Sequence, residues 1–221
     1  MTTMKIYLSS LLFVLISTLP AVANASVTPQ IAGGGGDVGS HSIALKSYGT
    51  VWAWGYNYYG QLGDGTNKDR DTPVQVSGLS GVIAIAGGDG HTIALKSDGT
   101  VWAWGSNDSG QLGDGTTTNR NTPVQVSDLS GVTAIPCGGN HSIALKSDGT
   151  VWAWGDNYHG QLGDGTTDTE RHTPVQVLGS GGVGFLSGVT AIAGGGLHTI
   201  ALKTDGTTTD GQTYPGASQR S

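Results

Sequence analysis

Short runs of alternating apolar and polar residues recur along the chain at intervals of about fifty residues. Four kinds of run follow one another in each unit, namely SIALK, TVWAW, TPVQV and VTAIA. Alternation with a period of two residues is typical of half-buried β-strands, and Gly-rich segments separate the runs. Glycine accounts for 39 of the 221 residues, and it disfavours helix interiors. The pattern therefore predicts an all-β protein.

The spacing of one histidine shows the length of the repeat. His41, His91 and His141 lie fifty residues apart, and His198 follows after fifty-seven because the third unit contains insertions in TTDTERHTP and LGSGGVGFLSG. Four short strands in about fifty residues, repeated in tandem, describe the four-stranded blades of a β-propeller. Blade units are therefore expected to start near residues 41, 91, 141 and 198.

Two features of the unit suggest how a blade is built. Asp-Gly separates the first two strands at Asp98-Gly99, Asp148-Gly149 and Asp205-Gly206, which predicts tight hairpins because both residues tolerate positive φ. The motif VWAWG, in the second run of each unit, occurs at 51–55, 101–105 and 151–155 and carries all six tryptophans. These rings are expected to form much of the core and to pack one blade against the next.

The full motif is similar to that of a known family. Gly87-Gly88, His91, Trp102-x-Trp104-Gly105, Asn107 and Gly110-Gln111-Leu112-Gly113 together resemble the regulator-of-chromosome-condensation repeat. The resemblance covers roughly residues 30–206 and implies a propeller, typically of seven blades. This chain offers about 3.5 blades, so the predicted propeller is incomplete. Residues 207–221 lack a strand-like period and are expected to form an irregular tail.

Three interpretations of the incomplete fourth unit stay open. The first is that the reading frame is truncated or shifted. The second is that the chain forms an open arc, which self-association through exposed blade faces completes. The third is that a half-propeller is stable by itself.

The first 25 residues differ from the rest. A charged start at Lys5, an apolar run over 6–19 and Ala23-Asn24-Ala25 indicate a signal peptide cleaved after Ala25. The protein is thus expected to be secreted or periplasmic, without a membrane span after cleavage. Removing Lys5 leaves nine basic and sixteen acidic residues, a net charge of −7. Nucleic acid is therefore a poor candidate partner.

The repeated polar residues are interpreted as scaffold, and no catalytic residue, metal site or cofactor is predicted. The histidine of each unit is expected to make a structural hydrogen bond within its blade. Asp64, Asp114 and Asp164 are expected to accept backbone N–H groups in turns. Arg70, Arg120 and Arg171 are expected to form ion pairs or loop clamps.

Positions that differ between units are free to specify a partner, because loops on a rigid scaffold commonly carry binding. Tyrosine is favoured at interfaces. The variable loops also include the stretches 67–69, 117–119 and 168–170 and the insertion Gly179–Phe185. The candidate binding residues are Tyr56, Tyr58, Tyr59, Asp108, Asp156, Tyr158 and His159.

The favoured function is an exported protein-binding or scaffolding module without catalysis of its own, whose protein partner is unknown. Three alternatives stay open, and the resemblance implies the first two. One is a secreted enzyme inhibitor similar to propeller-type β-lactamase inhibitors. Another is guanine-nucleotide exchange with chromatin binding, which the signal peptide and the acidic charge disfavour. The third is a propeller lyase or hydrolase, which would need acidic, basic or metal-binding side chains converging from several blades.

Overall fold

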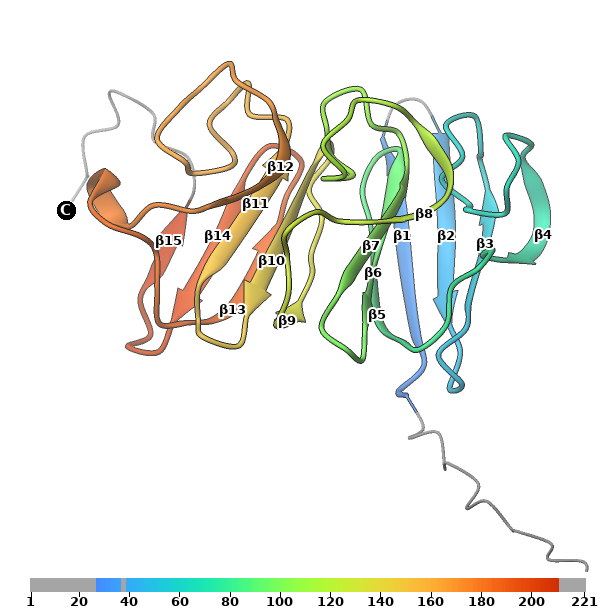
Figure 1. Ribbon diagram of the computed structural model, residues 1–221, viewed down its shortest axis with the longest axis horizontal. Helices are drawn as coiled ribbons and strands as arrows, with labels where there is room; N and C mark the ends of the chain where they lie inside the picture. The colour runs from blue at the N-terminus through green and yellow to red at the C-terminus, as the bar shows by residue number, and fades with distance from the viewer. Residues whose placement is uncertain (1–26, 37–38, 211–221) are drawn as a thin grey trace, which may run out of the picture.

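The computed structural model describes residues 27–36 and 39–210, and the architecture there is all-β. Four antiparallel sheets stand side by side along the molecule (Figure 1). The first comprises β1 (Gln30–Gly36), β2 (Gly39–Leu45), β3 (Val51–Gly55) and β4 (Arg70–Gln75). The second comprises β5 (Val82–Gly87), β6 (His91–Lys96), β7 (Val101–Gly105) and β8 (Arg120–Gln125).

The third and fourth sheets repeat this plan. The third comprises β9 (Val132–Ala134), β10 (His141–Lys146), β11 (Val151–Gly155) and β12 (Arg171–Gln176). The fourth has three described strands, β13 (Val189–Gly194), β14 (Thr199–Lys203) and β15 (Thr208–Asp210). A 3₁₀ turn, η1 (Ser180–Gly182), lies between the third and fourth sheets. The prediction of about three and a half four-stranded blades is confirmed.

The blades begin one strand earlier than the sequence predicted. The VTAIA-type strand pairs with the histidine strand that follows it, as β5 does with β6, and not with the TPVQ strand that precedes it. Blades therefore start near Gln30, Val82, Val132 and Val189, instead of near the four histidines. Repeat comparison fixes the length of a unit but not its starting point, because each unit contains the same four strands wherever it is divided.

The predicted hairpins form, although only glycine adopts positive φ. At the second hairpin, the Lys96 N–H donates to Thr100 O at 2.9 Å, and Gly99 has φ +78°. The Asp98 side chain closes the turn by accepting the Thr100 N–H at 3.0 Å. The expectation that both turn residues take positive φ is wrong, because Asp98 stabilises the turn through its side chain without a positive φ.

The hydrophobic core lies between the sheets. Ile43, Val51 and Leu62 of the first blade form one cluster with Ala94 and Trp104 of the second. The second cluster joins the second blade to Trp154 of the third in the same way. The indoles thus pack one blade against the next, as expected, because alternate residues of each central strand face opposite neighbours.

The tryptophans are not equally buried. Trp104 and Trp154 are completely buried, whereas Trp54 is half-buried, with no described sheet before its own. The other three are also half-buried, and the ring of each lies near the ammonium of a lysine at, or just after, the end of the preceding strand. The prediction that all six form a major part of the core therefore holds fully for only two.

Regular structure extends beyond Thr207, where the sequence predicted an irregular tail. Thr208–Asp210 form β15 and pair with β14, with Thr208 opposite Leu202. A strand edge offers backbone partners to any residue, so pairing occurs here without an apolar pattern. Residues 211–221 and the predicted signal peptide at 1–25 lie outside the described residues. In the described ranges, no helix is long and apolar enough to cross a membrane.

Candidate interaction surface

The candidate binding residues lie in the loops that join the third and fourth strands of each complete blade. Figure 1 shows these loops at the upper edge of the sheets, above β3, β7 and β11. Each loop is built around one buried asparagine. In the first blade, the Asn57 side chain donates to Thr66 O and Lys68 O at 3.1 and 3.0 Å and accepts the Leu62 N–H at 2.9 Å. Asn107 and Asn157 share most of these contacts.

An ion pair closes each loop at its base. Asp64 accepts the Thr66 N–H at 2.9 Å and pairs with Arg70 at 2.6 Å. Burial would raise the pKa of Asp64, but hydrogen bonds from Thr66 and Arg70 outweigh it and hold that pKa below its ordinary value. Asp114–Arg120 and Asp164–Arg171 repeat the pair at 2.8 and 2.6 Å. The scaffold interpretation of these aspartates and arginines is confirmed.

The repeated histidines also serve the scaffold, but their bonds cross between blades. His41 Nε2 lies 2.8 Å from Thr92 Oγ1 of the next blade, and that hydroxyl donates to Gln61 O at 3.0 Å. His41 must therefore donate from Nε2, and its burial favours the neutral ring. The expected bond within the blade is wrong, because the nearest hydroxyl lies on the facing strand of the neighbour. His91–Ser142 and His141–Thr199 repeat the contact.

The same histidines have strongly lowered pKa values. Burial lowers the pKa of His41 and His141 to about 4 and that of His91 to about 3. Each Nδ1 is buried without a hydrogen-bond partner among the described residues. The ring lies against a glycine of its own blade, and a Cβ on Gly88 would be 2.2 Å from the His91 ring. The paired glycines of the motif therefore make room for the histidine.

The tyrosines of the first loop form one cluster. The rings of Tyr56 and Tyr58 are stacked with centroids 6.4 Å apart, and Tyr59 meets Tyr58 edge to face at 5.1 Å. Tyr58 is 66% exposed, while Tyr56 and Tyr59 are half-buried. Three of the predicted residues are thus brought together in a pre-formed aromatic surface.

The third loop carries a smaller group. Tyr158 is 66% exposed, and its ring meets His159 edge to face at 5.0 Å. Asp156 accepts hydrogen bonds from the Tyr158 N–H and the Gln161 amide at 2.9 and 3.0 Å. On the second loop, Asp108 is exposed and stands without an aromatic neighbour in its own loop. The predicted residues therefore form two aromatic groups on the first and third blades, with Asp108 on the blade between them.

Two hollows lie beside these groups and contain residues that sequence reasoning missed. One, of about 260 Å³, is lined by Tyr59, Asn67 and Asn121; the other, of about 420 Å³, by Tyr158, Glu170 and His172 among others. Asn121 donates to Gly65 O at 3.1 Å and so ties the second blade to the first loop. A usable signal existed, because Asp71, Asn121 and His172 stand at equivalent positions yet differ between units.

The sequence profile of the RCC1-like domain matches residues 18–201. The chain belongs to the RCC1-like domain family. The ultraviolet-B receptor UVR8 of Arabidopsis thaliana is 43% identical over 58 residues, which are 26% of this chain and 12% of UVR8. Protein RCC2 of Homo sapiens is 36% identical over 51 residues, 23% of this chain and 10% of RCC2.

Solved structures support the same fold for this RCC1-like chain. Human WBSCR16 superimposes with a TM-score of 0.67 at 27% identity, over 77% of this chain and 44% of that structure. Yeast RCC1 (Prp20), solved bound to Kap60, superimposes with a TM-score of 0.65 at 29% identity, over 82% of this chain and 42% of that structure. The chain therefore spans less than half the length of the RCC1-like structures and about a tenth of the relatives described above.

Proposed function

We propose that this RCC1-like chain is an exported protein-binding module that recognises its partner through the loops above β3, β7 and β11. The observation that carries the proposal is the cluster of Tyr56, Tyr58 and Tyr59, held in place by the Asn57 frame and open to solvent. A rigid aromatic group loses little conformational entropy on binding, which is why tyrosine is favoured at such sites.

The charge around the second group indicates the partner's chemistry. Asp156, Asp168 and Glu170 line the hollow at Tyr158, and the only basic group there is His172, 3.6 Å from Glu170. Carboxylates beside an exposed tyrosine can bind an arginine or lysine side chain, because its cationic group can pair with a carboxylate and stack on the tyrosine ring. The partner is thus a protein with a basic side chain next to apolar surface, and binding weakens as salt rises.

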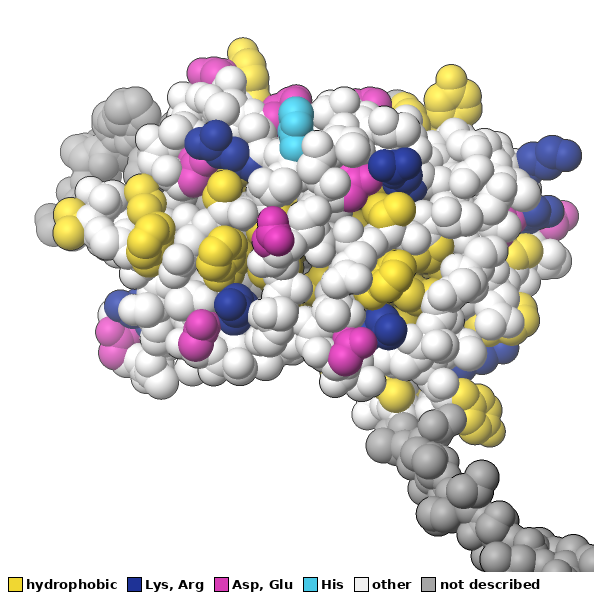
Figure 2. All heavy atoms as spheres, in the orientation of Figure 1, with side chains coloured by type: hydrophobic (Ala, Val, Ile, Leu, Met, Phe, Trp, Pro, Cys, Tyr) yellow, Lys and Arg dark blue, Asp and Glu magenta, His cyan; other side chains and the backbone are white. Residues whose placement is uncertain are grey.

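Two further parts of the proposal concern location and other classes of partner. The predicted signal peptide at residues 1–25 makes secreted or periplasmic enzymes the first candidate partners, in line with the inhibitor alternative. Nucleic acid is not the proposed partner, because the net charge is negative and the lysines and arginines on the face in Figure 2 do not gather into one patch. Self-association through exposed sheet faces is tested by the mass of the purified chain in solution.

Capture experiments with matched variants test the binding surface. The protein is used as bait against periplasmic and secreted proteins. Captured partners are then titrated with wild type and with a single variant that carries four substitutions, Tyr56→Ser, Tyr58→Ser, Tyr59→Ser and Tyr158→Ser. Affinity should fall at least about tenfold, because tyrosine is enriched among the interface residues whose truncation costs about 2 kcal/mol or more.

The control is Tyr48→Ser, which removes a 78% exposed tyrosine from the β2–β3 hairpin, outside the loops. It should leave affinity unchanged. Equal binding by the folded four-fold variant would rule out this surface. The N-terminal sequence of the protein recovered from the periplasm or medium tests export, and it should begin at Ser26.

A further inference from the structure

Two interfaces between blades contain a socket for an indole ring. Trp104 of the second blade enters a site made by Leu62, Val76 and Leu79 of the first, and its Nε1–H donates to Gln61 O at 2.9 Å. Gly63 completes the socket, since a Cβ there would be 2.7 Å from Trp104 Nε1. Trp154 fills the equivalent socket of the second blade and donates to Gln111 O at the same distance.

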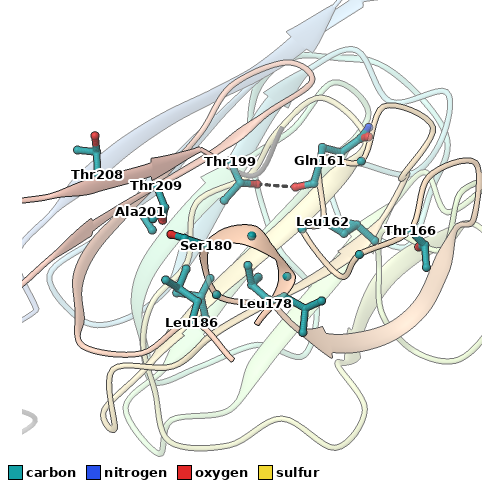
Figure 3. Close-up of a pocket in the computed structure, with 18 residues that line it drawn as sticks. Gln161, Leu162, Thr166, Leu178, Ser180, Leu186, Thr199, Ala201, Thr208 and Thr209 are labelled. Carbon is teal, nitrogen blue, oxygen red and sulfur yellow. Dashed lines mark hydrogen bonds between the residues drawn. The ribbon is translucent and has the colours of Figure 1, made fainter. Parts of the chain in front are cut away.

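The third blade has the same socket without a tryptophan from the next sheet. In the repeat, Trp104 and Trp154 align with Gly211, and Trp102 and Trp152 align with Thr209. Gln161 O accepts a hydrogen bond from Thr199 Oγ1 at 3.0 Å, as its counterparts do, but no described indole shares it. Where the indole would enter, a cavity of about 270 Å³ lies between the third blade and the fourth sheet (Figure 3).

The walls of this cavity are the socket residues in their repeat positions. Leu162, Gly163, Val177 and Leu186 correspond to Leu62, Gly63, Val76 and Leu79, and all four line it. Thr199 and Ala201 of β14 lie across from them. Figure 3 shows Leu178, Leu186 and Leu162 on one side of the opening, with Thr199, Ala201 and Thr209 on the other.

The insertion of the third unit adds a rim that the filled sockets lack. Residues 179–182, including η1, line the cavity, and Leu178 bridges Phe185 to close the inserted loop. Thr209 Oγ1 is buried at the cavity without a hydrogen-bond partner among the described residues. The volume exceeds the about 150 Å³ of an engineered apolar cavity that binds benzene, so an aromatic bicycle fits.

We propose that this cavity is a binding site for an indole ring, supplied by a small indole compound or by a tryptophan residue of a polypeptide. The ring lies between Leu162, Val177 and Leu186, and its N–H donates to Gln161 O, as Trp104 and Trp154 do in the other two sockets. The site lies at the junction of β11 and β14 and is separate from the tyrosine-bearing loops.

Titration of the purified chain with indole, by calorimetry and by saturation-transfer NMR, tests the site. Indole should bind one to one with a Kd of about 1 mM or tighter. 1-Methylindole lacks the N–H donor and should bind about tenfold more weakly. N-acetyl-tryptophanamide distinguishes the two sources, because comparable or tighter binding favours a tryptophan residue and weaker binding favours a small compound.

Two variants locate the binding. Gly211→Trp restores the aromatic residue of the repeat and should abolish indole binding. Gly196→Trp adds an indole at an exposed glycine in the loop between β13 and β14 and should leave indole binding intact. The proposal is overturned if wild type fails to bind indole. It is equally overturned if Gly211→Trp binds indole as wild type does.

Discussion

The buried histidines between the blades should make the fold unstable at mildly acidic pH. His41, His91 and His141 each donate from Nε2 to a hydroxyl of the next blade while neutral. In the folded protein their pKa values are about 3 to 4, whereas an unfolded chain protonates histidine near pH 6.5. Below pH 6.5 the unfolded state therefore binds more protons, and stability falls as pH falls.

The size of the effect follows from proton linkage. At pH 5 each of these histidines still lacks a proton in the fold, so the cost is 1.36 kcal/mol for each of the 1.5 pH units below 6.5, or about 2 kcal/mol per residue. Three residues in one cooperative unit lose about 6 kcal/mol. That is comparable with the whole stability of a typical domain, about 5 to 15 kcal/mol.

Denaturant unfolding followed by tryptophan fluorescence at pH 7.5, 6.5, 5.5 and 5.0 measures this loss. The aspartates whose pKa values are lowered below 3.8 lose their stabilising contribution only at more acidic pH, so they do not contribute in this window. A His91→Gln variant keeps a side-chain donor and should reduce the pH dependence by about a third. A free energy of unfolding that stays constant between pH 7.5 and 5.0 would refute the linkage.

Three further substitutions test the packing between and within blades. Trp104→Phe should cost about 2 to 4 kcal/mol in calorimetric unfolding, because it leaves a cavity and removes one of the two donors to Gln61 O. Trp54→Phe, at a half-buried position, should cost less than about 1 kcal/mol, and equal losses would contradict the packing of Trp104 between the blades. Gly88→Ala places a Cβ against the His91 ring and should lower the unfolding midpoint clearly, while Gly196→Ala meets no atom within 4 Å and should not. Asp114→Asn should lower the free energy of unfolding in urea by about 1 kcal/mol, a modest value because solvent screens the half-exposed Arg120. An unchanged free energy of unfolding would mean that the loop is stable without the ion pair.

The repeat made the fold predictable because every unit states the same pattern. Alternation in TVWAW and SIALK, joined by Asp98-Gly99, correctly gave a hairpin at each blade. The starting strand of a blade could not be found in this way, since the pairing of β5 with β6 instead of β4 depends on how the chain crosses between sheets. The strand at Thr208–Asp210 was missed for a related reason, because its pairing with β14 is a backbone property.

Contacts across blades set the limit on predicting the site. The variable tyrosines were found from their differences between units, and three of them do form one cluster. The bond from His41 to Thr92 was not foreseeable, because the two residues are 51 positions apart and meet only once the sheets stack. Asn121 and His172 were overlooked although they vary, because the variable stretches were taken to end at 119 and 170, before the arginines that close the loops.

Variation at a core position carries more information than variation in a loop. A loop residue such as Asp108 can change without loss of stability, because its side chain is exposed. The socket between blades is different, since Leu162, Gly163, Val177 and Leu186 keep the shape that holds Trp104 and Trp154 elsewhere, while the aligned position is Gly211. An empty socket of this shape destabilises the fold, because the residues that line it lose the van der Waals contacts that an indole would supply. The inserted loop at 179–185 borders this socket and not the two filled ones. A ligand bound here would restore the contacts that the socket residues lack.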